Sequence, residues 1–161
     1  GISPAAVRKA FAAFKGVEHR LEPCGVVRGV RCVDDSKATN VDSTVVALKA
    51  FETSGKRLLL ILGGPPKGLP YTPLKPWIEK TVKAVLTIGA AARRIEDDLA
   101  GQTHVFPCGD LKTAVDTALR IAQKGDVLLL SPACASFDQV RDFEERGLRF
   151  KALVAAAAKA A

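Results

Sequence analysis

The stretch RLLLILGG, residues 57–64, decides the fold class of this chain. Its apolar residues run from Leu58 to Leu62 without interruption, so the strand that they predict is buried on both faces. The run DVLLL at residues 126–130 has the same character, and VRCV at 30–33 is a third β-rich segment. Helical patterns of about ten residues separate such runs. The alternation predicts an α/β fold: a Rossmann-like, doubly wound, mostly parallel sheet with helices on both faces.

Further strands and helices are predicted along the whole chain, and no internal repeat or linker divides it. Ser3 and Asp110 are placed to cap the helices that follow them. A strand pair is expected over residues 17–34, with its turn at Arg28-Gly29. The remaining strands are predicted at residues 84–88 and 103–107. The helices are predicted at residues 4–15, 42–52, 74–81, 90–100 and 110–124, and from about Asp138 into the alanine-rich tail.

The composition is that of a globular domain. The chain has 161 residues, 48% of them hydrophobic and 25% charged, which fits one domain and excludes a disordered or fibrous protein. The longest apolar stretches are far short of the ~20 residues that cross a bilayer. Arg8, Lys9 and Lys15 interrupt any signal-peptide pattern at the N-terminus. We therefore expect a cytoplasmic protein that is neither membrane-bound nor exported.

The charge balance favours anionic partners. Lys and Arg outnumber Asp and Glu by 24 to 17, for a formal net charge of +7. The basic residues are scattered and the chain has one Tyr and one Trp, whereas nucleic-acid binders cluster their basic residues and interleave aromatics. Phosphorylated small molecules are therefore favoured over nucleic acid.

The four cysteines, Cys24, Cys32, Cys108 and Cys134, have no CxxC spacing, and the chain has only two histidines. A structural zinc cluster is thus not predicted, and we expect thiols without disulfides. Cys134 has no His near it in sequence to act as a base, so it is interpreted as a small buried residue rather than a nucleophile.

Three unusual loops follow predicted strands: DDSKATN at residues 34–40, GGPPKG at 63–68 and SPACASFD at 131–138. Because the carboxyl ends of parallel strands meet at one edge of a sheet, we expect the three loops to lie together. They supply carboxylates, two lysines, hydroxyls and free backbone N–H groups. This combination suits a ligand that carries phosphate or carboxylate groups.

Each loop also has a purely structural interpretation. A polar residue among 40–43 caps the next helix, and Ser136 or Asp138 could cap the last one. Gly63-Gly64 could be only a tight turn, and His19 alone is more typical of a surface position. The joint occurrence of the three loops is what favours a ligand site. The chain has neither GxGxxG nor GxxxxGK[ST], so other protein material must hold the phosphates of any nucleoside triphosphate.

These segments resemble the C-terminal domain of the Mur ligases. The resemblance covers about residues 14–154 and is most specific in DSKATN and SPACAS-DQ. It extends to His19-Arg20, to Gly63-Gly64 with Lys67-Gly68, and to FEERG at residues 143–147. The D-glutamate-adding members are the most similar. Other Mur ligases and the folylpolyglutamate synthetases share the architecture but lack SPACAS.

The resemblance implies that residues 1–18 are the tail of a central ATPase domain or a linker, and that 19–161 form the amino-acid-binding domain. It implies an ATP-dependent ligase of bacterial peptidoglycan synthesis that joins D-glutamate to UDP-N-acetylmuramoyl-L-alanine through an acyl phosphate. Mg²⁺ and the UDP-linked substrate would be held mainly by other domains. This domain would then bind D-glutamate and part of ATP without turnover, and would carry no metal ligand or catalytic residue of its own.

The resemblance also implies two sets of site residues. The side chains of the first set would bind D-glutamate through a cation, hydroxyls and helix N–H groups, with Phe143 two helical turns after Ser136 and on the same face. This first set is Thr39, Lys67, Ser136, Phe137 and Phe143. The set near the nucleotide is Arg20, Asp35 and Lys37, with His19 as a weaker companion.

Two other functions stay open. One is a free-standing binding module for an acidic metabolite, which would catalyse nothing by itself. The other is a ligase of the folylpolyglutamate synthetase type, with another amino-acid substrate. Amino-acid selectivity separates the second alternative from a D-glutamate ligase.

Overall fold

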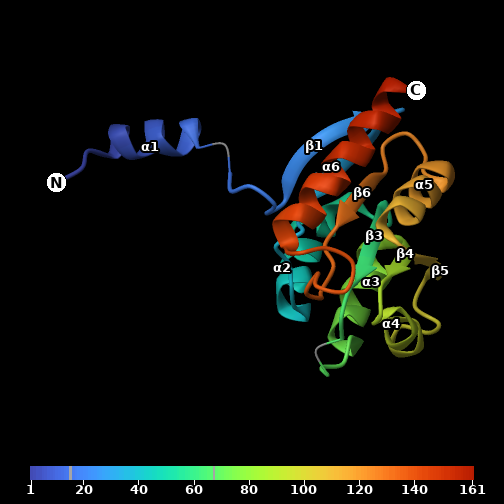
Figure 1. Ribbon diagram of the computed structural model, residues 1–161. Coiled ribbons are helices and arrows are strands. Elements are labelled where there is room, and N and C mark those ends of the chain that lie inside the picture. The colour runs from blue at the N-terminus through green and yellow to red at the C-terminus, as the bar shows by residue number, and fades with distance from the viewer. Residues whose placement is uncertain (15, 67) are drawn as a thin grey trace.

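The computed structural model describes residues 1–14, 16–66 and 68–161. A six-stranded sheet in the order β1-β2-β6-β3-β4-β5 forms its centre (Figure 1). The strands are β1 (Glu22–Val27), β2 (Val30–Asp34), β3 (Leu58–Gly63), β4 (Val82–Ile88), β5 (His104–Gly109) and β6 (Val127–Leu130). The helices are α1 (Pro4–Ala13), α2 (Val41–Ala50), α3 (Lys75–Thr81), α4 (Ala92–Asp98), α5 (Leu111–Ile121) and α6 (Phe143–Lys159), with short 3-10 turns η1 (Glu52–Ser54) and η2 (Thr72–Leu74).

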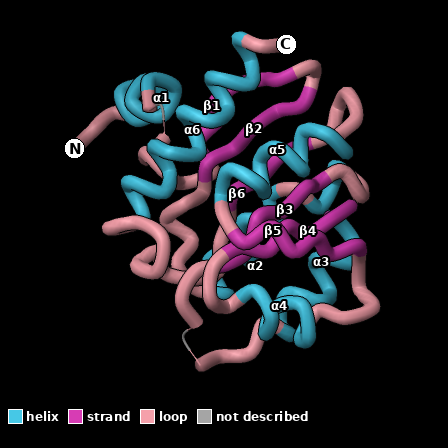
Figure 2. The backbone as a smooth tube through the Cα atoms, turned by 45° about the vertical axis from the view of Figure 1, so that its right-hand side comes forward, coloured by secondary structure: helices cyan, strands magenta, loops and turns pink. Residues whose placement is uncertain are grey.

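The sheet is parallel except for β1, which pairs antiparallel with β2. Figure 2 shows α2, α3 and α4 on one face of the sheet and α5 and α6 on the other. The predicted doubly wound α/β fold is therefore confirmed. The predicted hairpin is also confirmed, because Arg28 and Gly29 link β1 to β2 with φ angles of 48° and 81°. Both angles are in the left-handed region, which the two central residues of a type I′ hairpin turn require.

The position of β3 in the centre of the fold explains why its sequence is apolar throughout. All six of its residues are buried. Leu58, Leu60 and Leu62 pack with α2, α3 and α4, whereas Leu59 and Ile61 pack with α5 and α6. Successive side chains of a strand point to opposite faces, so a strand covered on both sides cannot alternate with polar residues.

The last helix begins later than predicted. It starts at Phe143, not near Asp138, and its cap is Asp142, whose Oδ1 accepts a hydrogen bond of 2.8 Å from the Glu145 N–H. Residues 136–140 instead form a turn, in which the Ser136 carbonyl accepts the N–H of Val140. Ser136 and Asp138 do not cap this helix, since its cap is Asp142. The Asp138 carboxylate accepts the N–H of Ala90 instead.

The first helix stands apart from the sheet. Ser3 caps α1 as predicted, by accepting the N–H of Ala6. No residue of α1 is buried, and the apolar side chain of Phe11 is 75% exposed. Figure 1 shows this helix projecting away from the rest of the fold. Within the described chain, no helix is both long enough and apolar enough to cross a membrane.

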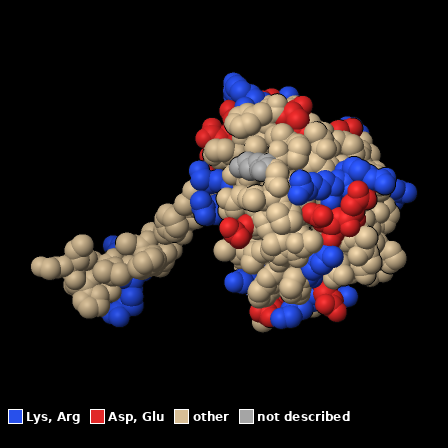
Figure 3. Space-filling model, turned by 90° about the horizontal axis from the view of Figure 1, so that it is seen from below, with Lys and Arg blue, Asp and Glu red and all other residues tan. Residues whose placement is uncertain are grey.

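Charges of both signs occur on the surface. In the view of Figure 3, Lys and Arg are interspersed with Asp and Glu over the folded domain and do not form one continuous basic face. The scattered basic residues of the sequence thus remain scattered in the fold on this face, whereas a groove for nucleic acid needs basic residues that gather along its length.

Candidate functional site

Two of the three predicted loops are joined by one buried side chain, Arg146 in the first turn of α6. Its guanidinium donates hydrogen bonds to the Ser36 hydroxyl and carbonyl and to the carbonyls of Cys134 and Ala135, at 2.6 to 3.1 Å. Ser36 in turn donates from its hydroxyl to the Phe143 carbonyl at 2.7 Å. The loop after β2 and the loop after β6 are therefore held together at the edge where we expected a ligand.

Sequence reasoning did not identify Arg146. The residue is only 3% exposed, and burial lowers the pKa of its guanidinium to about 10, because a charge removed from water is disfavoured. In the sequence Arg146 lies within FEERG, a charged segment that is typical of the solvent-exposed first turn of a helix. Its partners are 11 to 110 residues away, so no local pattern could have identified it.

Asp35 is buried at the same edge. Its Oδ2 accepts a hydrogen bond of 2.7 Å from the Ser131 hydroxyl, and its Oδ1 accepts one of 3.2 Å from the Leu21 N–H. Burial raises the pKa of the carboxyl to about 6, although these hydrogen bonds and the charge of Arg20 act in the opposite direction. Asp35 thus fastens the end of β6 to the segment that precedes β1.

Three of the four residues predicted near the nucleotide lie around one hollow of about 170 Å³. Arg20 and Lys37 are exposed at its rim, and Asp35 is buried in its wall. The hollow also borders α2, through residues 43, 46 and 47. The structure therefore brings Arg20, Asp35 and Lys37 together, as predicted.

The fourth residue, His19, does not line this hollow, and its interpretation as a surface residue is wrong. Its ring is 4% exposed and its Nδ1 is hydrogen-bonded to Asp34 Oδ2 at 2.7 Å. It packs edge-on to Phe143, with 6.1 Å between ring centroids. A Cβ atom at Gly147 would collide with the His19 ring and lie 2.6 Å from Asp34 Oδ2, so the glycine of α6 provides the space for this pair.

The residues predicted to bind D-glutamate are only partly brought together. Ser136 is 3% exposed, and Phe137 beside it is 75% exposed. Phe143 is half-buried and lies under Lys37, whose Nζ is 4.5 Å from the ring centroid, and Thr39 is also half-buried. The predicted helical face shared by Ser136 and Phe143 is wrong, because Ser136 lies in the turn before α6. Lys67 lies outside the described residues.

The turn that carries Ser136 is anchored to two further strands. Asp138 Oδ2 accepts a hydrogen bond of 2.9 Å from the Ala90 N–H, just after β4. Gln139 Nε2 donates one of 2.6 Å to the Gly109 carbonyl at the end of β5. A Cβ atom at Gly89 would collide with the Asp138 carboxylate. The DQ pair of the sequence is therefore an anchor for the loop after β6.

Gly63-Gly64 is more than a tight turn. A Cβ atom at Gly63 would collide with the Ile88 carbonyl, and one at Gly64 would collide with the Ala135 carbonyl. The φ angles of 134° and 142° are also ones that other residues rarely adopt. The two glycines let the ends of β3, β4 and the loop after β6 approach one another closely.

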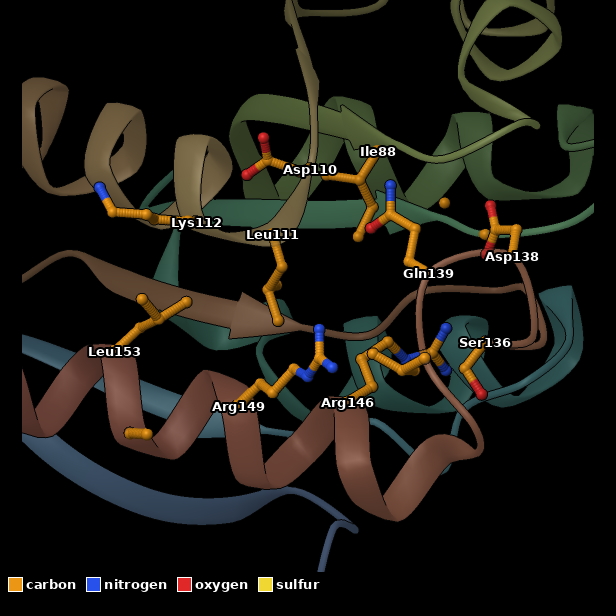
Figure 4. Close-up of a pocket in the computed structure, with 14 residues that line it drawn as sticks. Ile88, Asp110, Leu111, Lys112, Ser136, Asp138, Gln139, Arg146, Arg149 and Leu153 are labelled. Atoms are coloured by element: carbon orange, nitrogen blue, oxygen red, sulfur yellow. The ribbon is translucent and has the colours of Figure 1, made fainter.

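A larger cavity of about 780 Å³ opens beside this turn, between α5 and α6 (Figure 4). Gly63, Gly64 and Ser136 are among the residues that line it. The other residues that line it are Ile88, Asp110, Leu111, Lys112, Asp138, Gln139, Val140, Arg146, Arg149, Ala152 and Leu153. It shares no lining residue with the smaller hollow beside α2. The sheet edge therefore has two separate concave sites.

One group of side chains has the spacing of a metal site. Ligand atoms of His19, Glu22 and Asp34 lie within 4.8 Å of one another. These atoms already have partners, because His19 pairs with Asp34, and Glu22 accepts the His19 N–H and hydrogen bonds from Lys151. The group is explained as a network that fixes the segment before β1.

The cysteines are buried or half-buried, and no disulfide joins the four of them, all of which lie in the described part of the chain. Burial raises the pKa of the Cys24 thiol to about 12 and that of Cys32 to about 11. Cys134 is fully buried as predicted, with its Sγ 2.9 Å from the Tyr71 hydroxyl.

Comparison of the sequence with known proteins gives a family match and close relatives. The family described as "Mur ligase, glutamate ligase domain" matches residues 19–134. The chain is 49% identical over 151 residues to UDP-N-acetylmuramoylalanine--D-glutamate ligase of Elusimicrobium minutum, covering 94% of this chain and 33% of the relative. It is 50% identical over 153 residues to the ligase of the same name from Anaeromyxobacter dehalogenans, covering 95% and 33%. The chain thus spans about a third of the length of the curated relatives that it matches.

Solved structures share the fold. MurF ligase from Thermotoga maritima in complex with ADP superposes with a TM-score of 0.63 at 17% identity, over 90% of this chain and 33% of that one. Bifunctional folylpolyglutamate synthase/dihydrofolate synthase from Yersinia pestis gives a TM-score of 0.66 at 16% identity, over 95% and 35%. At these identities the likeness is one of fold alone.

Proposed function

This chain belongs to the Mur ligase family, as a glutamate ligase domain, and we propose that it is the amino-acid-binding part of a ligase that adds D-glutamate to UDP-N-acetylmuramoyl-L-alanine. The relatives at about half identity carry the name of that ligase, which acts in peptidoglycan synthesis. On this proposal the full ligase is a bacterial, cytoplasmic enzyme. The present chain binds D-glutamate and part of ATP, and the UDP-linked substrate binds to other domains.

One observation carries the proposal: Arg146 joins the two specific loops, DSKATN and SPACAS, at the carboxyl edge of a parallel sheet. Ligands of open α/β folds bind at this edge. The joined loops hold Lys37 within 4.5 Å of the Phe143 ring, so residues of the two proposed subsites are in contact. An amino acid and a nucleotide held at adjoining positions are what an amide ligase requires, because the reacting groups must be close.

In the proposed amino-acid subsite, hydroxyls and a cation bind carboxylate oxygens. Ser136 and Thr39 would donate hydrogen bonds, and Lys67 would provide the charge. Phe137 would cover the ligand, since its ring is exposed and therefore available to pack on it. Arg146 acts through Ser36 and the 134–135 carbonyls by fixing the loop, and is a positioning residue.

The nucleotide fits the smaller hollow in part. Arg20 and Lys37 suit phosphates, but about 170 Å³ is below the 300–1,000 Å³ typical of small-molecule sites. Asp35 already accepts two hydrogen bonds, so its proposed contact with ribose hydroxyls uses its remaining lone pairs. Much of the nucleotide and its Mg²⁺ would therefore be held by another domain. ATP, when bound, supplies the phosphoryl group that activates the substrate carboxylate.

We also propose that residues 1–18 are the tail of the preceding domain or a linker. The absence of buried residues in α1 supports this, because a helix of this domain would bury one face against the sheet. The buried His19 then marks where the present domain begins.

The direct test is an NMR titration of the chain with D-glutamate, with L-glutamate and then with ATP and Mg²⁺. We expect saturable shifts at Thr39 and Ser136 with D-glutamate at millimolar concentration, and at Arg20 and Lys37 with the nucleotide. In the full ligase, Lys67→Ala should raise the D-glutamate KM at least tenfold, the order of one lost charged hydrogen bond. Lys56→Ala, just before β3 at the opposite sheet edge, is the control and should leave KM unchanged.

Two results would count against the proposal. Equal response to D- and L-glutamate in the full ligase would favour a different amino-acid substrate, as in the folylpolyglutamate synthetase alternative. An unchanged KM in Lys67→Ala would remove that lysine from the site.

A further inference from the structure

We propose that the cavity between α5 and α6 is a second ligand site, which takes a small monocarboxylate with an apolar body. The cavity lies on the α5 and α6 face of the sheet, whereas the hollow assigned to the nucleotide lies beside α2 on the opposite face. Its volume of about 780 Å³ is within the range of small-molecule sites. This inference does not rest on the proposed ligase function.

The walls of the cavity are apolar. Ile88 and Leu111 come from the β4 end and α5, Val140 from the turn, and Leu153 from α6. Figure 4 shows Leu111 and Leu153 on opposite sides of the opening. A hydrocarbon or aromatic group bound here would release water from these surfaces, which is the main driving force for ligands of this kind.

A buried cation in the lining, Arg146, selects the charge of the ligand. All hydrogen-bond partners of the Arg146 guanidinium are uncharged oxygens, those of Ser36, Cys134 and Ala135. Among the described residues no carboxylate lies within ion-pair distance of it, and Cys134, Asp138 and Asp34 only partly offset the effect of burial on its pKa. A buried charge without a counter-ion is unfavourable, so an anion in the adjoining cavity gains from it.

Two exposed cations at the rim of the cavity also favour an anionic ligand. Lys112 of α5 and Arg149 of α6 both line the cavity, and Figure 4 shows Arg149 reaching towards Leu111 across it. Each has one carboxylate partner on its own helix, Asp116 at 2.6 Å and Glu145 at 2.7 Å. Such exposed pairs are weak, so the cations can turn to a ligand at little cost.

The carboxylates of the lining limit the ligand to a single negative charge. Asp110 accepts hydrogen bonds from the N–H and hydroxyl of Thr113, and Asp138 accepts one from Ala90. The lining itself thus holds three cations and two carboxylates, a net charge of +1. A dianion would face them at short range, and D-glutamate, which has two carboxylates and an ammonium but no apolar body, is poorly matched to these walls.

The test is a titration of the ¹⁵N-labelled 161-residue chain with 4-phenylbutyrate, followed by NMR. We expect saturable shifts at the amides of Leu111, Gln139 and Ala152, with those of Arg20 and Lys37 unmoved. The matched probe is 4-phenylbutylamine, which has the same ring and chain length but a positive charge. It should bind at least tenfold more weakly. Equal binding of acid and amine would overturn the proposal, because the cations would then not select the ligand.

Two pairs of variants locate the site. Ala152→Leu fills the cavity from an exposed position of α6 and should weaken 4-phenylbutyrate binding at least tenfold, whereas Ala158→Leu, exposed on the same helix outside the cavity, should not. Arg149→Gln should weaken it about fivefold, the scale of one exposed ion pair. Its control is Arg93→Gln on α4, which removes an exposed arginine with a similar ion pair, to Asp97.

Unchanged affinity in Ala152→Leu, or shifts spread over the whole chain, would overturn the second site. Failure of the D-glutamate titration is a separate result when it is read at Thr39, which lies in the loop after β2 and does not line the cavity. Ser136 lines the cavity as well, so a shift at Ser136 does not separate the two sites. The two proposals can therefore fail independently.

Discussion

The loops after β2 and β6 leave neighbouring parallel strands at the same edge, yet they are held in different ways. The loop at residues 35–40 combines local hydrogen bonds, from the Ser36 N–H to Asp34 Oδ1 and from the Ala38 N–H to the Asp35 carbonyl, with distant ones from Arg146 and Ser131. The loop at residues 131–142 is held by distant groups, namely Ala90, Gly109 and Arg146. Two equally specific motifs can therefore share the same long-range anchor, Arg146, and still differ in how much local structure supports them.

The largest expected effect comes from the group shared by both loops. Arg146→Leu should lower the free energy of unfolding by about 3 kcal/mol or more, because it leaves four buried acceptor contacts without a donor. Urea denaturation of the chain measures it. Arg149→Leu, one turn later and exposed, should change the stability by no more than about 0.5 kcal/mol.

The substitution Arg146→Lys tests whether the positive charge alone is enough to hold the two loops. Arg146→Lys keeps the cation but has three donors on one nitrogen, so it cannot span the carbonyls of Cys134 and Ala135 and both oxygens of Ser36. We expect a loss between those of wild type and Arg146→Leu. Full stability in Arg146→Leu would show that the two loops hold each other without the guanidinium, and that Arg146 is not their shared anchor.

The contrast between the loops also explains what could be predicted from the sequence. The fold was accessible because β3 and its neighbours are apolar over their whole length, and because Ser3 and Asp110 cap helices through contacts three residues away. The grouping of Arg20, Asp35 and Lys37 is confirmed, since Asp35 and Lys37 lie two residues apart in the loop after β2 and Arg20 lies just before β1.

The start of α6 and the burial of His19 depend on contacts that no local sequence pattern encodes. The start of α6 was misplaced because Asp138 resembles a helix cap, and only its partner Ala90, 48 residues earlier, shows otherwise. The sequence alone does not reveal the burial of His19, because that burial depends on Gly147 at the other end of the chain. Each error concerns a polar side chain whose partner is distant in sequence but fixed by the sheet order.

The pH dependence of stability tests the loop after β2 at Asp35. The folded-state pKa of Asp35 is about 6, above its usual value of 3.8, so the folded protein keeps the proton that the unfolded chain releases between these values. Stability from this group therefore falls as pH rises through this window. Relative to Asp35→Asn, which has no proton to lose, the wild type should lose about 3 kcal/mol between pH 3.5 and 7.

The measurement is the difference in unfolding free energy between wild type and Asp35→Asn across this range, which cancels the titration of other groups. Asp97→Asn, an exposed residue of α4, is the control, and its difference from wild type should stay within about 0.5 kcal/mol. A difference between wild type and Asp35→Asn that does not change with pH would show that Asp35 is charged in the fold at little cost.

A smaller effect is expected at the long-range anchor of the second loop. Asp138→Ala removes one hydrogen bond to the Ala90 N–H at the molecular surface, and should cost about 1 kcal/mol. Amide exchange at Ala90 should speed up while that of Ala38 in the other loop stays unchanged. Faster exchange at both sites would mean that the two loops open together.

The smallest effect on stability is expected at Phe137, an exposed residue of the loop after β6. Its side chain is 75% exposed, so Phe137→Ala should change the unfolding free energy by less than about 0.5 kcal/mol. The proposed contact with D-glutamate nonetheless predicts a several-fold higher D-glutamate KM in the full ligase, because an aromatic cover is lost from the ligand. Phe11→Ala, equally exposed on α1, is the control for both measurements. A KM unchanged by Phe137→Ala would place the amino-acid subsite on the other side of the turn, towards the buried Ser136.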